Sequence, residues 1–146
     1  MKESNKLARD GAGVAYLNVF HPDVIDFLSV RKENADEKVR IKTLSLGLIV
    51  PDKYYELVAK NQYMYLFSPY DIRKEYGKPM SEIDITKEYD NLVKNTNINK
   101  TKIRARDLER EIGNLQNESG YPYIVNIDHA NRENPIDGII KMSNLC

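Results

Sequence analysis

The sequence has very little cysteine and no long hydrophobic run, and both absences restrict what the protein can be. Its single cysteine, Cys146, is the last of 146 residues. One cysteine cannot form an internal disulfide, so a reducing, cytoplasmic setting is expected. The longest apolar run, Leu44 to Val50, is far shorter than the roughly 20 residues that span a bilayer. The polar N-terminus is not followed by the hydrophobic region of a signal peptide, so we expect neither a membrane anchor nor export.

An excess of charge and recognisable metal or phosphate motifs are also missing. The formal net charge is zero, which provides no general attraction for nucleic acid or anionic membranes. The tyrosines and phenylalanines lie mostly in apolar patterns, typical of core packing rather than of base stacking. His21 and His129 are far apart in the sequence and neither has a second ligand at metal spacing, so no metal site is expected. Gly11-Ala12-Gly13 precedes a strand, whereas a dinucleotide fingerprint follows one, and no phosphate-binding loop is present.

Strand and helix patterns alternate along the chain. Val14 to Phe20, Val39 to Val50 and Tyr123 to Ile127 are predicted as strands, and the second is apolar on both faces, as in a parallel sheet. Met64 to Phe67 is a further short apolar stretch. The alternation predicts an α/β protein with a largely parallel sheet. Three strands are too few for a complete barrel, so we interpret the chain as a section of a larger protein.

Helix start and stop signals separate these strands. Helices are predicted to begin at Asp23, at Pro51-Asp52, at Ser68-Pro69 with an end at Gly77, at Asp84 or Thr86, and at Thr101. The last is the longest, with Thr101 as its cap and Gly120 as its end. Asn95 to Asn99 is read as a polar turn, and a loop is expected after the last strand.

The apolar spacing predicts which side chains of these helices face the core. In the first helix these are Val24, Ile25, Phe27 and Leu28; in the second, Tyr55 and Val58, with Leu57 as a further candidate; in the longest, Ala105, Leu108, Ile112 and Leu115.

The last five residues match the beginning of a catalytic signature. Met142-Ser143-Asn144-Leu145-Cys146 agrees with the start of the motif Asn-Leu-Cys-x-Glu of class I ribonucleotide reductases. Seven further segments resemble parts of the same family in the same order: residues 11–17, 21–23, 32–38, 42–47, 66–71, 105–108 and 118–123. The chain therefore resembles, over nearly its whole length, the large (alpha) subunit of a class I ribonucleoside-diphosphate reductase, and the class Ib form most closely.

This resemblance implies a fold. The family has a ten-stranded α/β barrel made of two antiparallel halves, with the active cysteine on a finger loop inside it. Residues 1–146 would be part of this catalytic barrel domain. Residues 1–13 would belong to the specificity-loop region, and residues 142–146 would begin the finger loop.

The resemblance also implies a radical mechanism that converts ribonucleoside diphosphates to deoxyribonucleoside diphosphates for DNA synthesis. Cys146 would be the transient thiyl radical that takes the 3′ hydrogen from the ribose. Asn144 would hydrogen-bond the sugar hydroxyls, and Leu145 would contact the substrate beside them. Arg9, with Gly11, Ala12 and Gly13, would form the specificity loop between the bound effector and the substrate base, where glycines allow changes of shape.

Cofactors and partners follow from the same resemblance. No cofactor is expected to bind this chain directly: the radical would come from the metal cofactor of a small (beta) subunit, and dNTP or ATP effectors would bind the full allosteric enzyme. The other expected partners are the remainder of the large subunit and a thioredoxin- or glutaredoxin-like reductant. The general-base glutamate of the motif and the redox cysteine pair lie outside the sequence, so the chain alone is expected to be inactive.

Two other readings stay open at this level. The chain could be a non-catalytic remnant or interaction module derived from the subunit, in which Cys146 is a free terminal thiol. It could also be an unrelated small nucleotide-binding protein, although only the glycine-rich stretch from Arg9 to Gly13 supports this, and Arg9 could be a solvated charge.

Overall fold

The computed structural model describes residues 13–29 and 44–133. Their elements are, in chain order, β1 (Gly13–Asn18), α2 (Val24–Ser29), β2 (Leu44–Val50), α3 (Asp52–Ala59), β3 (Tyr63–Phe67), α4 (Pro69–Tyr76), the 3-10 turn η2 (Met80–Glu82), α5 (Ile85–Lys94), β4 (Lys100–Arg104), α6 (Ala105–Ser119), β5 (Tyr123–Asn126) and α7 (Ile127–Arg132).

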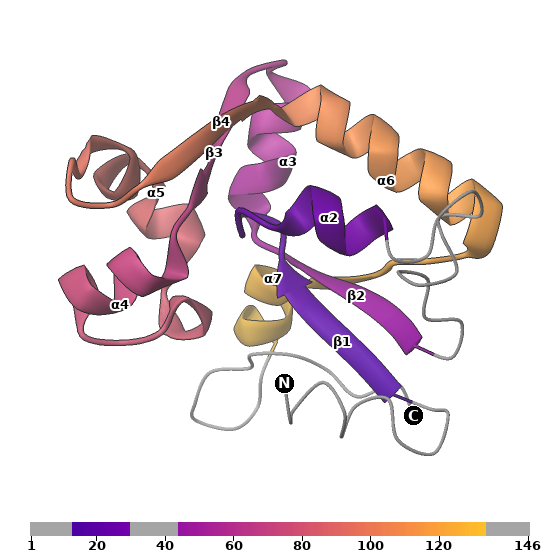
Figure 1. Cartoon of the computed structure of the whole chain (residues 1–146), viewed down its shortest axis with the longest axis horizontal. Helices are drawn as coiled ribbons and strands as arrows, with labels where there is room; N and C mark the ends of the chain where they lie inside the picture. Colours follow the sequence, from indigo (N-terminus) through magenta and orange to yellow (C-terminus); the bar gives the residue numbers. More distant parts are fainter. Residues whose placement is uncertain (1–12, 30–43, 134–146) are drawn as a thin grey trace.

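A parallel sheet with the order β1-β2-β5 lies below α2 and α6 in the view of Figure 1. Leu17 of β1 pairs with Leu48 of β2, and Leu48 pairs with Ile124 of β5. The three predicted strands and the predicted parallel α/β class are therefore confirmed, although residues 39–43 of the second predicted strand lie outside the described residues. Within the described ranges the sheet is open, as in a section of a barrel.

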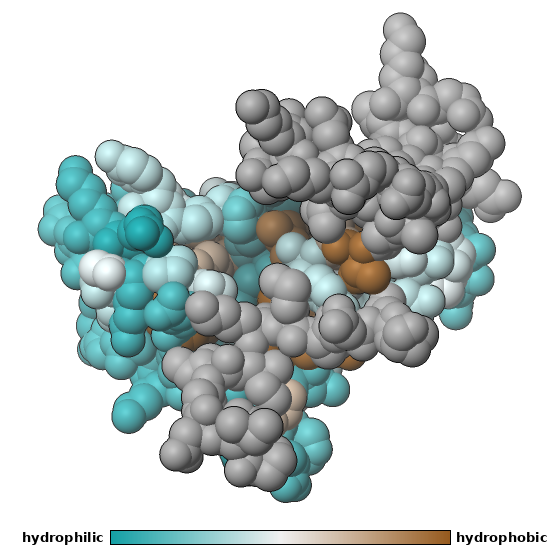
Figure 2. Space-filling model, turned by 90° about the horizontal axis from the view of Figure 1, so that it is seen from below, coloured by the Kyte–Doolittle hydropathy of each residue, from teal (hydrophilic) through white to brown (hydrophobic). Residues whose placement is uncertain are grey.

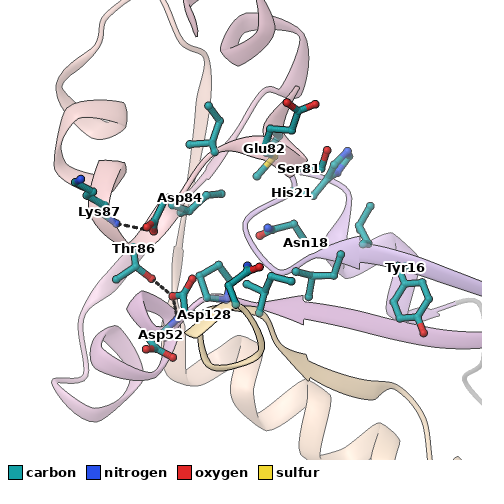
Figure 3. A pocket seen from close by; sticks show the side chains of 18 of the residues that line it. Tyr16, Asn18, His21, Asp52, Ser81, Glu82, Asp84, Thr86, Lys87 and Asp128 are labelled. Carbon is teal, nitrogen blue, oxygen red and sulfur yellow. Dashed lines mark hydrogen bonds between the residues drawn. The ribbon is translucent and has the colours of Figure 1, made fainter. Parts of the chain in front are cut away.

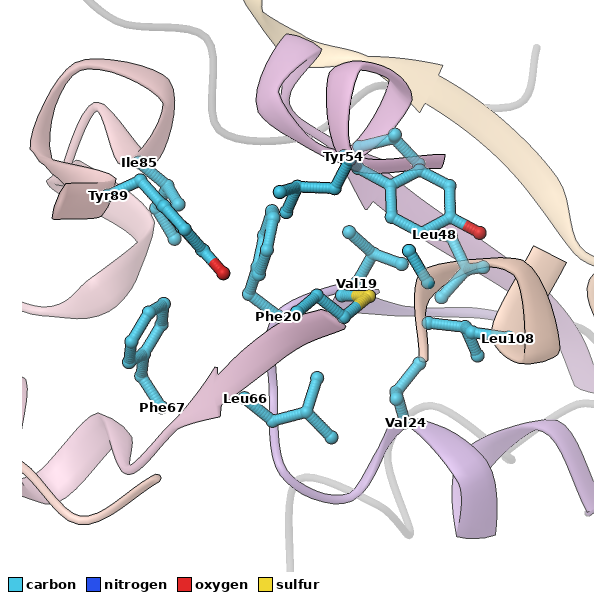
Figure 4. Close-up of a cluster of buried hydrophobic side chains, with 14 of the residues drawn as sticks. Val19, Phe20, Val24, Leu48, Tyr54, Leu66, Phe67, Ile85, Tyr89 and Leu108 are labelled. Carbon is cyan, nitrogen blue, oxygen red and sulfur yellow. The ribbon is translucent and has the colours of Figure 1, made fainter. Parts of the chain in front are cut away.

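One face of this sheet packs against helices. Leu48 and Val50 point to that face and are fully buried, together with Val24 of α2, Tyr54 of α3 and Leu108 of α6 (Figure 4). On the opposite face, Tyr16 and Tyr123 pair with Gly47 from either side. Alternate residues of a strand point to opposite faces, so this glycine leaves room for the aromatic ring on β1.

The antiparallel pair of β3 and β4 forms a second, smaller sheet. It extends away from the parallel sheet, with α4 and α5 beside its far end (Figure 1). The backbone N–H of Phe67 donates to the carbonyl of Phe20, 2.9 Å away, and the rings of Phe20, Phe67 and Tyr89 lie 5.5–6.2 Å apart by their centroids. These contacts join the β3–β4 sheet and α5 to Phe20, which lies shortly after the end of β1.

Most of the predicted helix ends are confirmed. The Ser68 hydroxyl accepts from the N–H of Asp71 at the start of α4, and the Asp84 carboxylate accepts from Lys87 at the start of α5. Gly77 and Gly120 follow α4 and α6 with φ angles of 72° and 79°. Only glycine adopts this left-handed conformation without a steric cost.

The predicted start of the longest helix is wrong. Thr101 lies in β4 and pairs with Leu66, and α6 begins at Ala105 after Arg104, which makes no side-chain capping bond. The apolar stripe of α6 is nevertheless as predicted, since Ala105, Leu108, Ile112 and Leu115 are all buried. Thr101 is part of a strand because it pairs with β3, which is distant from it in the sequence.

Two predicted core positions turn outward. In α3, Tyr54 and Leu57 are buried, while Tyr55 is 42% exposed and donates a hydrogen bond to Asn126. In α2, Ile25 is also 42% exposed. Residues three or four apart share a helix face, so the burial of one such pair in each helix turns its neighbours away from the core. Leu57 is confirmed as a core residue, and Val58 and Phe27 pack partly buried against the core.

The end of the last predicted strand also differs. β5 stops at Asn126, and Ile127 begins α7, where the sequence predicted a loop. The helix has only six residues, which is too short for a clear periodic pattern.

Gly47 offers a test of the packing between β1 and β2. A Cβ atom at this position would lie 2.6 Å from two ring carbons of Tyr16, whereas a Cβ at Gly113 in α6 would meet nothing within 4 Å. We expect Gly47→Ala to lower the free energy of unfolding by about 1–3 kcal/mol, because the ring must move. The matched control, Gly113→Ala, should raise it by about 0.5–1 kcal/mol through helix propensity. Urea unfolding of the chain measures both, and equal effects of the two substitutions would contradict the packing described.

Candidate functional site

A cavity of about 730 Å³ lies at the carboxyl ends of the three parallel strands (Figure 3). Ligand sites of open α/β sheets commonly lie at this edge. One wall is formed by residues at the end of each strand and just after it. The other wall is formed by η2 and the first turn of α5. The polar side chains lining it include Asn18, His21, Asp52, Ser81, Asp84, Thr86, Lys87, Asp128 and Arg132.

Apolar side chains complete the lining. Leu17, Ile49, Met80, Ile83 and Ile127 contribute to the walls. In the view of Figure 2, hydrophobic residues are visible near the middle of the face, between hydrophilic residues. The cavity thus combines apolar walls with a small number of placed polar groups, which is the usual character of a binding site.

Asp128 is the centre of the hydrogen bonds in this cavity. Its Oδ2 atom accepts from the backbone N–H of Asp52 at 2.7 Å and from the hydroxyl of Thr86 at 2.5 Å. The Thr86 hydroxyl in turn accepts from the backbone N–H of Lys53 at 3.0 Å. One carboxylate therefore connects α7 with the first turns of α3 and α5 (Figure 3).

This arrangement caps α3 from a distance. The first N–H groups of a helix have no partner within it, and the residue before α3 is Pro51, which has no side-chain capping bond. Asp128 and Thr86 supply the missing acceptors, and a carboxylate is also favoured by the positive end of the helix dipole. Arg132 adds an ion pair to Asp52, with 2.9 Å between Nη1 and Oδ2.

His21 is held in its neutral form on another side of the cavity. Burial lowers its pKa, and the nearby carboxylate of Asp23 partly opposes this shift. The Nδ1 atom accepts a hydrogen bond from the backbone N–H of Asp23 at 3.0 Å. An Nδ1 that accepts has no proton of its own, so the Nε2 atom carries the hydrogen of the neutral ring.

The charges of the lining disfavour a phosphate group. Four carboxylates, those of Asp52, Glu82, Asp84 and Asp128, stand against the two cations of Lys87 and Arg132. The helix N-termini that open here are already occupied: Asp128 and Thr86 accept from α3, and Asp84 accepts from α5. Phosphate binding at a helix N-terminus requires free N–H groups, so we expect a polar, uncharged or cationic group in this cavity.

Nearly all the predicted site residues lie outside the described residues. These are Arg9, Gly11, Ala12, Asn144, Leu145 and Cys146; Gly13 is the first residue of β1. The cavity residues Asp128, Thr86 and Asp52 were not predicted from the sequence. A usable signal was present, since Asp52 and Asp128 both lie just after predicted parallel strands, whose carboxyl ends meet at one edge.

The described ranges contain neither a metal-binding cluster nor a membrane-spanning helix. No group of three or more histidine, cysteine, aspartate or glutamate side chains within residues 13–29 and 44–133 could hold a metal ion. None of the helices in these ranges combines the length and the apolar character needed to cross a lipid bilayer.

Comparison with known proteins assigns this α/β section to a family. The family model of the ribonucleotide reductase barrel domain matches residues 2–146. Ribonucleoside-diphosphate reductase subunit alpha of Mycoplasma genitalium is 53% identical over 144 residues, and that of Mycoplasma pneumoniae is 52% identical over 138 residues. Ribonucleoside-diphosphate reductase NrdEB subunit alpha of Bacillus subtilis is 48% identical over 140 residues.

The matches cover most of this chain but little of each relative. They include 98%, 94% and 94% of the chain, and 20%, 19% and 13% of the three relatives, respectively. Because the family model covers nearly the whole sequence, the chain belongs to the ribonucleotide reductase barrel-domain family. The resemblance inferred from the sequence motifs, and with it the interpretation as a barrel section, is confirmed.

The lowered pKa of His21 predicts a dependence of stability on pH. Protonation favours the unfolded chain, in which histidine titrates near 6.5. The free energy of unfolding should therefore decline as the pH falls below about 6.5, down to the lower pKa of the folded state. His21→Asn keeps an acceptor near the Nδ1 position but cannot be protonated there, so we expect it to flatten this decline in urea unfolding between about pH 7.5 and about pH 5.5.

Asp23→Asn is the matched control for this prediction. It removes the carboxylate that raises the pKa of His21, so the decline should become steeper. A decline in the His21→Asn variant as steep as in the unmodified chain would contradict the assignment.

Proposed function

We propose that this chain is a part of the catalytic barrel of a ribonucleoside-diphosphate reductase alpha subunit, which reduces ribonucleoside diphosphates to deoxyribonucleoside diphosphates. One observation supports this most strongly: the match to the barrel-domain family extends over residues 2–146 and so includes Asn144-Leu145-Cys146. A relative that carries this function in its name, from Mycoplasma genitalium, is 53% identical to the chain.

In this proposal Cys146 performs the hydrogen transfer. A radical on its sulfur takes the hydrogen atom from the ribose C3′, so that an S–H bond forms as the C–H bond breaks, and the same hydrogen returns at the end of the cycle. The two bonds are close enough in strength for the transfer to be reversible. Asn144 hydrogen-bonds the sugar hydroxyls with its amide, which both donates and accepts, and Leu145 contacts the substrate beside it.

We assign substrate selection to the segment that leads into β1 and includes its first residue. Arg9 with Gly11, Ala12 and Gly13 is proposed to form the loop that reports the bound effector to the substrate base. Gly13 begins β1, and the cavity described above lies at the other end of this strand. The acidic lining and capped helices of the cavity support placing the diphosphate of the substrate away from it.

The electrons for the reduction must come from outside this chain. Replacing the 2′ hydroxyl by hydrogen releases water and consumes two electrons, which two thiols provide as they form a disulfide. The chain has one cysteine, and Cys146 is regenerated as a thiol in each cycle. We therefore propose as partners the remainder of the alpha subunit, a small subunit whose metal cofactor supplies the radical, and a thioredoxin- or glutaredoxin-like reductant. The need for reduced thiols favours the cytoplasm.

The chain on its own should be inactive. It spans 13–20% of the length of the three relatives and lacks a cysteine pair. We expect no deoxyribonucleoside diphosphate when the purified chain is incubated with a ribonucleoside diphosphate, a radical-generating small subunit and a dithiol reductant. Product formation above a control without the chain, measured by chromatography, would contradict this expectation.

In the complete alpha subunit that contains this sequence, Cys146→Ser should abolish turnover, because a hydroxyl cannot form the corresponding radical. Assembly with the small subunit, measured by co-purification, should be unchanged. Asn144→Ala should retain activity but lower kcat about tenfold, the effect of losing a hydrogen bond to the substrate. Turnover by the Cys146→Ser variant would exclude the proposed role of this residue.

A further inference from the structure

The outer edge of β4 has no strand partner among the described residues. In the β3–β4 sheet, the backbone N–H of Tyr65 donates to the Tyr89 hydroxyl, so it points away from β4. Opposite residues of an antiparallel pair alternate between bonded and non-bonded positions, and Lys102 lies opposite Tyr65. The backbone N–H and C=O groups of Lys102, and of Arg104 two residues further on, therefore point to the outer edge of β4.

The other edge of this small sheet is already occupied. The outward N–H groups of Tyr65 and Phe67 in β3 donate to Tyr89 of α5 and to Phe20 after β1. In β4, by contrast, most residues are exposed. The outer edge of β4 is thus the place in the β3–β4 sheet that is open to a further strand.

Two cations accompany this edge. Lys102 and Arg104 lie on the same face of the sheet as Tyr63, because alternate residues share a face and Arg104 pairs with Tyr63. The Lys102 Nζ atom lies 4.3 Å and the Arg104 Cζ atom 4.6 Å from the centre of the Tyr63 ring. Neither cation forms a salt bridge within the described part of the chain. Lys100 differs, since its Nζ atom already donates to two backbone carbonyls at 2.8 Å.

The composition of β4 favours a partner that associates reversibly and carries negative charge. Free strand edges invite pairing with other chains, and native proteins protect them with charged side chains. β4 has three cations among its five residues, Lys-Thr-Lys-Ile-Arg, a protection that a permanently covered strand does not need. Like charges on opposite strands repel and unlike charges attract. The cations therefore disfavour pairing with a second copy of β4 and favour a strand that carries carboxylates.

We propose that the outer edge of β4 binds an extended, acidic segment of a separate partner protein. The segment adds to the β3–β4 sheet as a third strand, bonded to the backbone of Lys102 and Arg104. Its carboxylates lie beside these two side chains. In strand addition of this kind the main-chain hydrogen bonds supply affinity and the alternating side chains supply specificity. The inference does not depend on the role proposed for Cys146.

Fluorescence anisotropy of the purified chain with a labelled peptide tests this. The peptide has about ten residues, long enough for a strand, and glutamate alternates with threonine in it. We expect saturable binding that weakens as the salt concentration rises. A peptide with glutamine in place of glutamate, and one with proline at a central threonine, should each bind at least about tenfold more weakly. The first lacks the charges and the second lacks a backbone N–H.

Variants of the chain separate backbone pairing from charge. Lys102→Pro removes an outward N–H that makes no bond to β3, and should abolish peptide binding. Lys102→Thr keeps this N–H and should weaken binding only about threefold, the loss of one exposed ion pair. The double variant Lys102→Glu/Arg104→Glu should lose the acidic peptide and bind a peptide of alternating lysine and threonine instead. Arg110→Glu, an exposed site on α6, is the matched control and should stay within about twofold of the unmodified chain.

Urea unfolding of each variant checks that it remains folded. If Lys102→Pro does not fold, the exchange of peptide preference in the double variant decides the question. Absence of binding by the acidic peptide, or equal affinities of Lys102→Pro and Lys102→Thr, would overturn the inference. So would an unchanged peptide preference in the double variant.

Three further results would assign the edge to a different partner and so overturn the inference. Tighter binding of a single-stranded thymidine oligonucleotide that displaces the peptide would assign it to nucleic acid. Peptide binding by the chain but not by the complete alpha subunit would assign it to the remainder of that subunit. Loss of co-purification with the small subunit, when the complete alpha subunit carries Lys102→Glu/Arg104→Glu, would assign it to the small subunit.

Discussion

Parallel pairing on both sides of β2 is the constraint on which the arrangement of this molecule depends. A strand between two parallel neighbours must be connected to them by crossovers rather than by tight hairpins, and its residues are buried on both faces. Leu48 and Val50 on one face show almost no exposure, and Ile49 on the other face is only 9% exposed. The same pairing brings the carboxyl ends of all three strands to one edge. Asp52 and Asp128 meet there although 76 positions separate them.

The position of α5 depends on a second, apolar joint. Phe20 lies in the turn after β1, and its ring packs against Phe67 and Tyr89 (Figure 4). Its carbonyl accepts a hydrogen bond from the backbone N–H of Phe67. Burial raises the pKa of Tyr89 to about 12, so its hydroxyl remains protonated and accepts from the N–H of Tyr65. These contacts anchor α5, and Thr86 in its first turn therefore reaches Asp128. The polar network at the edge of the sheet therefore depends on the packing of the rings of Phe20, Phe67 and Tyr89.

The sequence could predict the elements whose apolar residues form a pattern within one short segment. Burial on both faces identified β2, and the stripe from Ala105 to Leu115 identified α6. It could not predict β4, whose residues Lys100 to Arg104 are mostly exposed and become a strand only because β3 offers a partner. The prediction that Tyr55 faces the core was wrong for a similar reason, since Tyr54 is the buried residue. Adjacent tyrosines have the same propensity, and only the tertiary contacts place Tyr54 in the core with its hydroxyl on Glu109 at 2.8 Å.

The candidate site shows the same division between local and distant information. The family motifs predict roles for Asn144 and Cys146 from a few adjacent residues, whereas the Asp128 network required the sheet topology, since its three helices come from separate parts of the chain.

That network also explains why the large cavity is unlike a phosphate site. A parallel sheet edge with two helix N-termini has the general form that binds phosphates, but here protein carboxylates and a hydroxyl occupy the N–H groups. A second anion would compete with Asp128 and Asp84 for the same donors and would face their negative charge. The dipoles of α3 and α5 therefore stabilise the protein's own acceptors, and α7 is bound to the fold by interactions that in other sheets serve to bind a ligand.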